Sequence, residues 1–388
     1  MNILYIQNAY HFSIEIESAL ASLGHSLTIH PAPPINEADS PSYLQSLLGA
    51  VKQSTPTLMF SCGFSPFISL ACGALGLPYI SWLIDAYDTN YYSSAIKNEW
   101  NYIFTIDSLF CQELKELGVK HTYYLPLAIP TVINTDTITR DPLPYTADIS
   151  LIGTIISRDN LSCHPLNSSS SLRDSTKGYL EGCIACQYQL HNMPSICSKL
   201  PAYVWNDLVT GFPIENLPDL ESAAHYYDHK YFNPLITYAE REILLNSFTR
   251  ENRYQEIHLY NSNTSQDIST EKHCGWADPY LDLPNIAKQS IINLVIAHRS
   301  YKSAIPPIAW AIIAYQGFLL CNYQQDFELF SDISPALFRT EHEMLSKAAY
   351  YYHHEDERNS IVKALFEEAS KMHTYQNRIS EMFSYTNI

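Results

Sequence analysis

Short apolar runs alternate with amphipathic stretches along the first third of the chain. Residues 2–7, 26–30 and 57–61 are apolar runs of strand length. The segments between them carry apolar residues at helical spacing, and Gly24 and Gly76 stand where two of these helices should end. This order of strand, helix and strand is typical of a parallel sheet covered by helices.

The same alternation continues to about residue 130. Further strands are expected at 79–84, 102–106 and 122–126, and helices at 13–23, 43–52, 67–75 and 111–117. Residues 131–146 are rich in Thr, Pro and Asp, a composition that favours an interdomain linker. We therefore assign residues 1–140 to an N-terminal Rossmann-like domain.

A second α/β domain is expected after this linker, over residues 141–372. Its predicted strands are 148–153, 256–260, 291–296 and 317–321, and its helices are 308–315, 341–352 and 356–373. Residues 177–245 are expected to be mostly helical, with interruptions at prolines. The chain then ends in a separate C-terminal segment, 373–388.

Composition and charge exclude several classes of function. Hydrophobic residues make up 46% of the 388, enough for two cores, and the formal net charge is −17. Such an acidic chain is not expected to bind nucleic acid or an anionic membrane surface. The apolar run 304–321 contains Pro306 and Pro307 and is expected to be a core element, so the protein is not expected to be integral to a membrane.

The start of the chain and its cysteines favour the cytoplasm. The first residues have neither a basic region nor an unbroken apolar stretch, so no signal peptide is expected. There are nine cysteines, and Cys183 and Cys186 form a CxxC without a second pair at zinc spacing. We expect buried thiols, no metal and no cofactor.

Three features fall at the ends of predicted strands. Asp85 and Asp107 follow two apolar runs of the first domain, and Gly153 ends the first strand of the second. Because open α/β sheets bind ligands outside the carboxyl ends of their strands, we expect a ligand in a cleft between the two domains.

Several segments together resemble the CgeB-like, or spore-maturation-protein-like, glycosyltransferases. In the first half these are YISWLIDAYDTNYY (79–92), the segment 102–128, and ADISLIGT (147–154). In the second half they are KGYLEGCIACQ (177–187) and the segments 290–327 and 348–383. The resemblance thus covers nearly the whole chain.

This resemblance implies a GT-B fold, in which two Rossmann-like domains face one another across a cleft. It also implies a metal-independent transfer from a UDP- or GDP-linked sugar held by the second domain, to a protein, glycan or cell-surface acceptor. The last helix, around 373–383, would cross back to the first domain, and His373 would anchor it rather than take part in chemistry.

The donor side of the site is expected to combine a strand-to-helix turn with polar groups of the second domain. Gly153 would let backbone N–H groups approach a diphosphate, although a plain tight turn explains the same glycine. The predicted donor-binding residues are Gly153, Thr154, Arg158, Tyr260, His298, Ser300, Pro306, Gln316 and Gly317.

The family pattern is interrupted in the segment 304–317. Ile308 stands where the resemblance implies a phosphate-binding arginine, Ala311 where it implies a ribose-binding carboxylate, and Gln316 replaces a glycine. Each lost charge-assisted bond is worth about 1.5–3 kcal/mol. Arg299, Lys302 or Arg158 could supply charge instead; each is equally well explained as a loop or surface residue.

An inverting transfer needs a general base beside the acceptor hydroxyl. Asp85 is the candidate because it follows a buried strand, and a helix-capping or turn role is its alternative explanation. Asp88 and Asp107 are expected on the acceptor side of the cleft.

Two functions remain open, with a third as an outlier. The first is an active glycosyltransferase, and the second is a catalytically impaired pseudo-glycosyltransferase that acts as a binding protein or as the partner subunit of an active enzyme. The interruption at Ile308 and Ala311 is the feature that motivates the second. The third is an unrelated two-domain ligand-binding protein.

Overall fold

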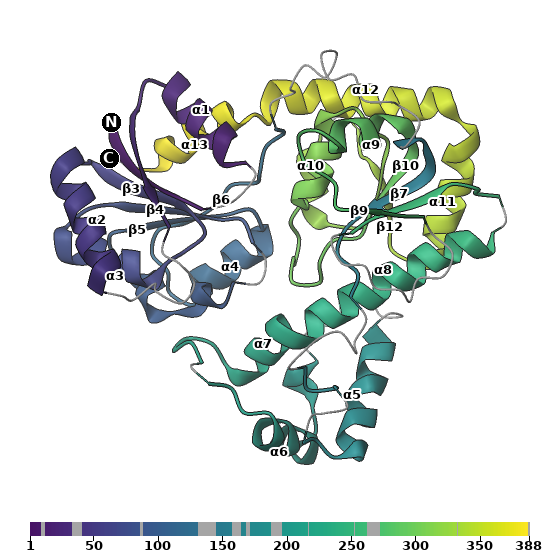
Figure 1. Ribbon diagram of the computed structural model, residues 1–388, viewed down its shortest axis with the longest axis horizontal. Coiled ribbons are helices and arrows are strands. Elements are labelled where there is room, and N and C mark those ends of the chain that lie inside the picture. The colour runs from purple at the N-terminus through teal and green to yellow at the C-terminus, as the bar shows by residue number, and fades with distance from the viewer. Residues whose placement is uncertain are drawn as a thin grey trace.

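The fold is taken from a computed structural model (Figure 1). The structure describes residues 1–8, 12–32, 41–85, 88–130, 145–156, 164–167, 171–187, 196–215, 217–251, 253–261, 272–331 and 333–386. Within them the chain forms two parallel six-stranded sheets and a helical segment that lies below both in Figure 1.

The N-terminal sheet has the strand order β2-β1-β3-β4-β5-β6, and all its pairings are parallel. Its strands are β1 (Asn2–Gln7), β2 (Ser26–Pro31), β3 (Leu58–Cys62), β4 (Tyr79–Leu83), β5 (Asn101–Thr105) and β6 (Thr122–Tyr124). The helices α1 (Ser13–Ser22), α2 (Pro41–Ser54), α3 (Pro66–Leu75) and α4 (Ser108–Glu116) connect them. Every residue of β3 and β4 is buried, which explains why these strands are continuous apolar runs in the sequence.

The C-terminal sheet has the order β12-β11-β10-β7-β8-β9. Its strands are β7 (Ala147–Ile152), β8 (Ile257–Tyr260), β9 (Lys272–Gly275), β10 (Ser290–Val295), β11 (Leu319–Asn322) and β12 (Ala336–Phe338). This is the strand order of the dinucleotide-binding fold, and the direction of winding reverses between β7 and β10. The helices α9 (Leu283–Gln289), α10 (Pro307–Ala314), α11 (Glu341–His353) and α12 (Glu355–Met372) belong to this domain.

The helical segment is inserted between β7 and β8. It contains α5 (Asp174–Gln187), α6 (Ala202–Gly211), α7 (Ala223–Tyr227), a π-helical turn (Asp228–Phe232) and α8 (Asn233–Arg250). It has an apolar core of its own, which includes Leu180, Val204, Leu208 and Phe232. The helix α8 continues from this segment to the C-terminal domain (Figure 1).

The last helix, α13 (Tyr375–Tyr385), returns to the N-terminal domain and packs against α1. The Ile129 N–H donates to the His373 carbonyl at 2.9 Å. The Arg378 Nε donates to the Leu127 carbonyl at 3.1 Å, while its Nη2 lies 2.7 Å from His373 Nδ1. His373 therefore sits at the crossing between domains, among the rings of Trp310 and Phe330.

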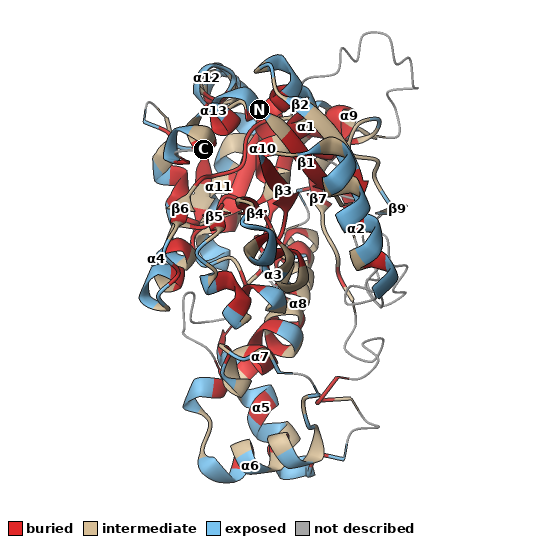
Figure 2. Ribbon diagram, turned by 90° about the vertical axis from the view of Figure 1, so that its left-hand side faces the viewer, coloured by how far each residue is buried: buried red, intermediate tan, exposed pale blue. Residues whose placement is uncertain are grey.

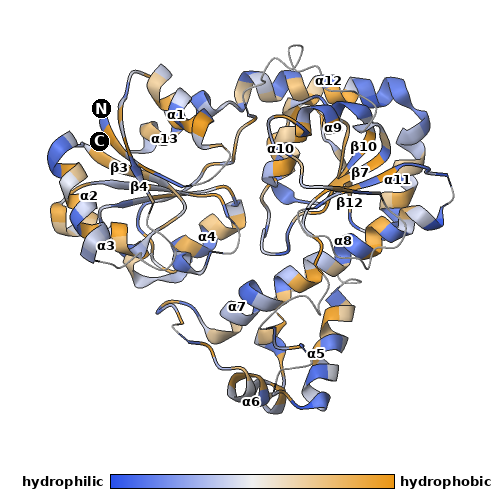
Figure 3. Ribbon diagram, in the orientation of Figure 1, coloured by the Kyte–Doolittle hydropathy of each residue, from blue (hydrophilic) through white to orange (hydrophobic). Residues whose placement is uncertain are grey.

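Burial and hydropathy follow this architecture. In Figure 2 the strands are largely buried and the outer faces of the peripheral helices are exposed. In Figure 3 apolar colour lies on the strands and on α10, whereas α11 and α12 carry much hydrophilic colour. One apolar core joins the two sheet domains, since Trp82 of β4 and Trp310 of α10 belong to the same cluster as Ile379 of α13. Among the described residues, no helix combines the length and the apolar character needed to cross a bilayer.

The predicted elements agree with the structure in the first domain and at β7, β8, β10 and β11. The prediction omitted three short elements, β9, α9 and β12. Each has seven residues or fewer, and β9 (KHCG) carries almost no apolar signal. Such elements are fixed by pairing and packing with their neighbours rather than by their own pattern.

Candidate functional site

A cleft of about 610 Å³ lies at the carboxyl ends of β10, β11 and β12. Its walls are the helical segment, the loops that follow these three strands, and Leu109 of α4 from the N-terminal domain. The volume falls within the range of small-molecule sites, roughly 300–1,000 Å³. The cleft therefore lies where an open α/β sheet binds its ligand.

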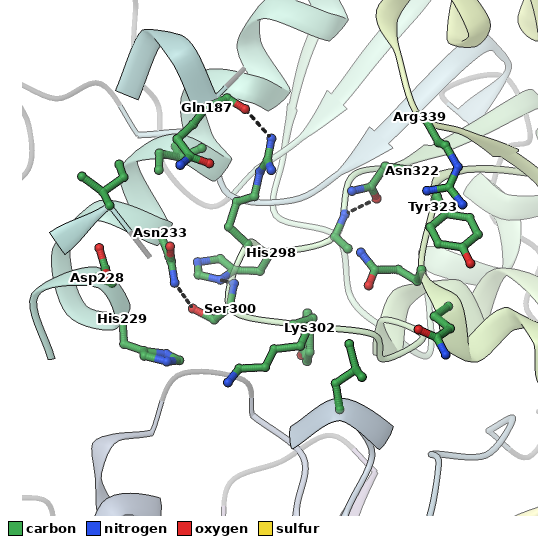
Figure 4. A pocket seen from close by; sticks show the side chains of 18 of the residues that line it. Gln187, Asp228, His229, Asn233, His298, Ser300, Lys302, Asn322, Tyr323 and Arg339 are labelled. Carbon is green, nitrogen blue, oxygen red and sulfur yellow. Dashed lines mark hydrogen bonds between the residues drawn. The ribbon is translucent and has the colours of Figure 1, made fainter. Parts of the chain in front are cut away.

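The loop after β10 contributes His298 and Ser300 to the cleft (Figure 4). The Ser300 N–H donates to His298 Nδ1 at 3.2 Å, so the imidazole proton belongs on Nε2. Burial, together with the neighbouring Arg241 charge, lowers the pKa of His298 to about 3. The side chain is thus neutral at physiological pH, and its Nε2–H is a hydrogen-bond donor.

Arg299 fixes this loop to α8. Its guanidinium forms a two-point ion pair with Glu240, at 2.9 and 3.0 Å, and its backbone N–H donates to Thr237 Oγ1 at 2.9 Å. Both side chains are largely buried. Arg299 lines the cleft, but its charge is already matched by Glu240.

The π-helical turn, with the end of α7 before it and the start of α8 after it, supplies a second wall. His225, Asp228, His229 and Asn233 all face the cleft, and Figure 4 shows the last three with the Asn233 amide donating to Ser300 Oγ at 3.4 Å. A π-helical turn inserts an extra residue into the helical repeat and is frequent at functional sites. Here it places Asp228 and Asn233, five residues apart, on one face.

The third wall follows β11 and β12. The Asn322 amide oxygen accepts from the Ala297 N–H at 2.8 Å and so ties this wall to the loop after β10. The guanidinium of Arg339 stacks on the Tyr323 ring, 3.4 Å from its centroid, and Arg339 is exposed (Figure 4). Arg339 therefore brings a positive charge to the rim of the cleft.

Gly153 lies at the switch point between β7 and β10, beside the cleft rather than in its lining. A Cβ at Gly153 would be 3.1 Å from the guanidinium of Arg241. Arg241 donates to the carbonyl of Thr154 at 2.8 Å and to that of Ile296 at 2.9 Å, so it bridges the ends of β7 and β10. The absent side chain of Gly153 thus makes room for an arginine.

Asp85 follows β4 at the carboxyl edge of the N-terminal sheet. It is half-buried and lines a small side pocket of about 20 Å³ together with Asp107, His229 and Ser300. Asp88 caps the 3₁₀ turn Thr89–Tyr92 by accepting from the Asn90 N–H at 2.9 Å. Burial, reinforced by the nearby Asp85 charge, raises the pKa of Asp88 to about 6.

Asp107 joins the two domains. Its carboxylate caps α4 by accepting from the Phe110 N–H at 2.9 Å. It also accepts from the backbone N–H groups of Lys302, Ser303 and Ala304, at 2.7, 3.0 and 3.3 Å, and from Ser303 Oγ at 2.8 Å. These bonds hold the loop after β10 against the N-terminal domain.

Several predicted donor residues are not in the lining of the cleft. Gln316 and Gly317 precede β11 and so lie at the amino edge of the sheet, opposite the cleft. Tyr260 is buried at the end of β8, and its hydroxyl oxygen lies 3.4 Å from His258 Nδ1. Pro306 is the buried N-cap residue of α10. Arg158 lies outside the described residues.

Ile308 and Ala311 pack inside the C-terminal domain. Both contact a small apolar cluster formed by Leu283, Ala287 and Tyr315. Neither is among the residues that line the cleft. The side chains present at these two positions therefore contribute to packing and not to the lining of this cleft.

Sequence reasoning missed several polar residues that line the cleft, among them Asp228, Asn233, Asn322 and Arg339, and it missed Arg241 beside the cleft. Asn322 is the last residue of β11 and Arg339 directly follows β12, so a position at a strand end is the signal for both, provided that β12 is recognised. Asp228 and Asn233 are brought to one face only by the π-helical turn, which no pattern in the sequence indicates.

Comparison with known proteins gives a partial match in sequence and a full-length match in fold. Residues 236–384 match the family described as glycosyl transferase-like, which is less than half of the chain. No curated protein matches the chain.

The solved structures that are similar include the apo form of WaaB, a lipopolysaccharide outer core galactosyltransferase. Its TM-score is 0.50 at 9% identity, over 99% of each chain. WaaG, a glycosyltransferase involved in lipopolysaccharide biosynthesis, has a TM-score of 0.49 at 9% identity, over 100% of each chain. A glycosyltransferase from Rickettsia africae ESF-5 has 0.49 at 12% identity, over 100% of this chain and 99% of the other.

At such low identities a structural similarity is evidence for the fold alone. The structure that supports the fold here is WaaB, with its TM-score of 0.50. Two parallel six-stranded sheets with flanking helices match that enzyme over the full chain. The GT-B fold predicted from the sequence is thereby confirmed.

Proposed function

We propose that the protein is a glycosyltransferase that moves a sugar from a UDP- or GDP-linked donor to a protein, glycan or cell-surface acceptor. The observation that carries this proposal is the polar cleft at the carboxyl ends of β10, β11 and β12 in a GT-B fold. The glycosyl transferase-like match over residues 236–384 covers these strands and supports the same activity. The resemblance to CgeB-like proteins is the reason for proposing a protein, glycan or cell-surface acceptor.

We assign the donor diphosphate to the part of the cleft between His298, on the loop after β10, and Arg339, on the wall after β12. Arg339 is exposed at the rim and offers a charged fork to phosphate oxygens. His298 stays neutral at physiological pH, so its Nε2–H offers a hydrogen bond to a phosphate oxygen without adding a positive charge. Arg241 adds positive potential at the switch point behind this loop.

The acceptor hydroxyl is assigned to the N-terminal side, next to Asp85. In an inverting transfer the Asp85 carboxylate takes the hydroxyl proton while the oxygen attacks the anomeric carbon, and the nucleoside diphosphate leaves. Burial, with the nearby Asp85 charge adding to it, raises the pKa of Asp88 to about 6, so Asp88 holds a proton closer to neutral pH than an ordinary aspartate does.

The alternative, a catalytically impaired pseudo-glycosyltransferase, is motivated by Ile308 and Ala311, which stand where the family resemblance implies an arginine and a carboxylate. Because both side chains pack against Leu283, Ala287 and Tyr315 rather than in the cleft, their apolar character does not remove a ligand contact there. We therefore retain the active enzyme as the proposed function.

The test is release of nucleoside diphosphate from a panel of UDP- and GDP-linked sugars, followed by chromatography with and without glycan acceptors. We expect slow hydrolysis of one donor by the wild-type chain and faster release when a suitable acceptor is present. A folded protein that neither binds nor hydrolyses any donor of the panel would contradict the proposal.

A further inference from the structure

Three potential metal ligands recur at four-residue intervals where the helical segment meets the cleft. Glu221 precedes α7, His225 lies on α7, and His229 lies in the π-helical turn. One ligand atom of each residue lies within 4.8 Å of the other two. Tetrahedral zinc with bonds of about 2.0–2.2 Å needs ligand atoms roughly 3.4 Å apart, so small side-chain rotations would close the site.

The Glu221 carboxylate is buried without a partner. The residue is 6% exposed, and both carboxylate oxygens are buried with no hydrogen-bond partner among the described residues. Burying an unpaired carboxylate is costly, and proteins normally compensate it with hydrogen bonds, a counter-charge or a metal. A cation held between Glu221 and the two imidazoles would supply this compensation.

The surroundings hold the two imidazoles in place. The rings of His225 and His229 are stacked with centroids 6.2 Å apart. The Tyr92 ring lies 6.0 Å from His225 and 5.8 Å from His229, and its hydroxyl donates to Glu113 at 3.0 Å. These ring contacts limit how far the two imidazoles can move apart.

The turn before Glu221 is fixed to the N-terminal domain. The Leu220 N–H donates to the Tyr92 carbonyl at 2.9 Å, and the Ser94 N–H donates to Asp219 Oδ1 at 2.6 Å. The three ligands therefore lie where the helical segment, the N-terminal domain and the cleft meet.

We infer that Glu221, His225 and His229 form a binding site for a divalent transition-metal ion of the zinc class. Two imidazoles and a carboxylate are a ligand set used for zinc when a fourth position stays open. Because His225 and His229 line the cleft, that position faces it and would take water or an oxygen of a ligand in the cleft. This inference goes beyond the proposed glycosyl transfer, does not depend on it, and departs from the expectation that the chain holds no metal.

The experiment uses the full chain without an affinity tag, treated with a chelator and dialysed. Zn²⁺ is titrated by competition with a chromophoric chelator, and Co²⁺ serves as an optical probe of the ligand set. We expect one ion per chain, a Co²⁺ spectrum without thiolate charge transfer, and a higher thermal midpoint in Zn²⁺.

The variants identify the ligands. We expect His225→Gln and Glu221→Gln each to weaken Zn²⁺ binding by about 10- to 100-fold or more, as when a metal ligand or its support is removed. His229→Gln should do the same. The His225 side chain is only half-buried, so its replacement should disturb the fold little. The matched control is the double variant His342→Gln/His353→Gln, which changes two exposed histidines of α11 and should leave binding unchanged.

Three results would overturn the inference. One is no Zn²⁺ binding by the wild-type chain, and another is equal affinity in the His225→Gln and Glu221→Gln variants. The third is binding that disappears in Cys183→Ser/Cys186→Ser, which would place the ion on the thiols of α5 instead. Thermal midpoints without metal show whether each variant is folded, so a loss of binding can be separated from a loss of structure.

Discussion

Arg339 and Asp85 belong to different domains and have different surroundings. Arg339 is exposed and stacks on Tyr323, whereas Asp85 is half-buried beside Asp107 and His229. These differences suit the roles proposed for them, because an exposed guanidinium can close on a phosphate, whereas Asp85 stands at the carboxyl edge of its sheet, where open α/β sheets bind ligands.

Replacing Asp85 by Asn should remove the general base and leave the fold intact. General-base catalysis contributes typically 10²- to 10⁴-fold, so we expect the transfer rate to fall by at least about 100-fold with little change in donor affinity. The rate is followed as nucleoside diphosphate release. Asp356→Asn, at an exposed position of α12, is the control, and an Asp85→Asn enzyme as fast as this control would exclude Asp85 as the base.

Gly317 is a residue whose role is packing rather than binding. A Cβ there would be 2.6 Å from the Ala287 carbonyl oxygen and 2.8 Å from Asn293 Nδ2. Asn293 Nδ2 also donates to the Ala287 carbonyl, at 3.0 Å, so an added methyl group would press on a buried hydrogen-bonded network.

Gly317→Ala should therefore lower the free energy of unfolding by about 2–4 kcal/mol. The matched control is Gly182→Ala in α5, where a Cβ has nothing within 4 Å and the helix should gain up to about 1 kcal/mol. Denaturant unfolding measures both changes. Equal stability of the two variants would contradict the contacts described for Gly317.

At the scale of elements, the sequence predicts the strands well and the site poorly. Strands such as β4 are apolar throughout because both faces are buried, and this pattern is visible in the sequence. The position of Arg339 depends on β12, which has three residues, and that of Asp228 depends on a π-helical turn. Both are set by tertiary packing, so local pattern could not reveal them.

The predicted phosphate site at Gly153 shows the same limit. The sequence predicts Gly153 at the end of a strand, and β7 ends at Ile152, whereas the next described helix begins only at Asp174. The sequence does not show that Arg241, 88 positions away, would occupy the space beside Gly153. A glycine that admits a ligand and one that admits a side chain have the same appearance in a single sequence. The positions of Ile308 and Ala311 likewise depend on which face α10 packs against α9.

His373 lies just before α13, where the chain returns to the N-terminal domain, and it should make the free energy of unfolding depend on pH. Burial, then the Arg378 charge, lowers the pKa of His373 to about 4, below its ordinary value near 6.5. The unfolded chain therefore binds a proton at a higher pH than the folded one, and stability falls as the pH drops from about 6.5 towards 4.

His373→Gln should make this fall shallower by on the order of 1 kcal/mol, allowing for partial solvent screening of the imidazole. The free energy of unfolding at pH 7 and pH 5 measures the effect. His298 and His229 shift in the same direction and keep part of the dependence in the variant. An unchanged difference between the two pH values would show that His373 titrates normally in the folded state.

For the whole molecule, the relation between the domains rests on a shared apolar core and on Asp107. The core joins Trp82, Trp310 and Ile379, and the Asp107 carboxylate accepts bonds from both domains. Because the loop held by Asp107 is also the loop that carries His298 and Ser300, the same contact sets the shape of the cleft.

Replacing Asp107 by Asn keeps the size of the side chain but turns one acceptor into a donor that faces backbone N–H groups. We expect the free energy of unfolding to fall by about 2–4 kcal/mol and donor binding to weaken with it. Calorimetric unfolding is the measurement, with Asp356→Asn as the surface control. A variant as stable as that control would show that these bonds do not fix the domains.

The central claim is that the cleft holds a nucleoside diphosphate sugar. The direct test is calorimetric titration, in which a panel of UDP- and GDP-linked sugars is added to the wild-type chain and to the Arg339→Met variant. We expect one donor to bind the wild type and its affinity to fall about 10-fold or more in the variant, since a charge-assisted bond to phosphate contributes about 1.5–3 kcal/mol. Arg253→Met, at an exposed position outside the cleft, should bind like the wild type. Absence of binding by any donor to the folded wild-type chain, or equal affinity in Arg339→Met, would contradict the account.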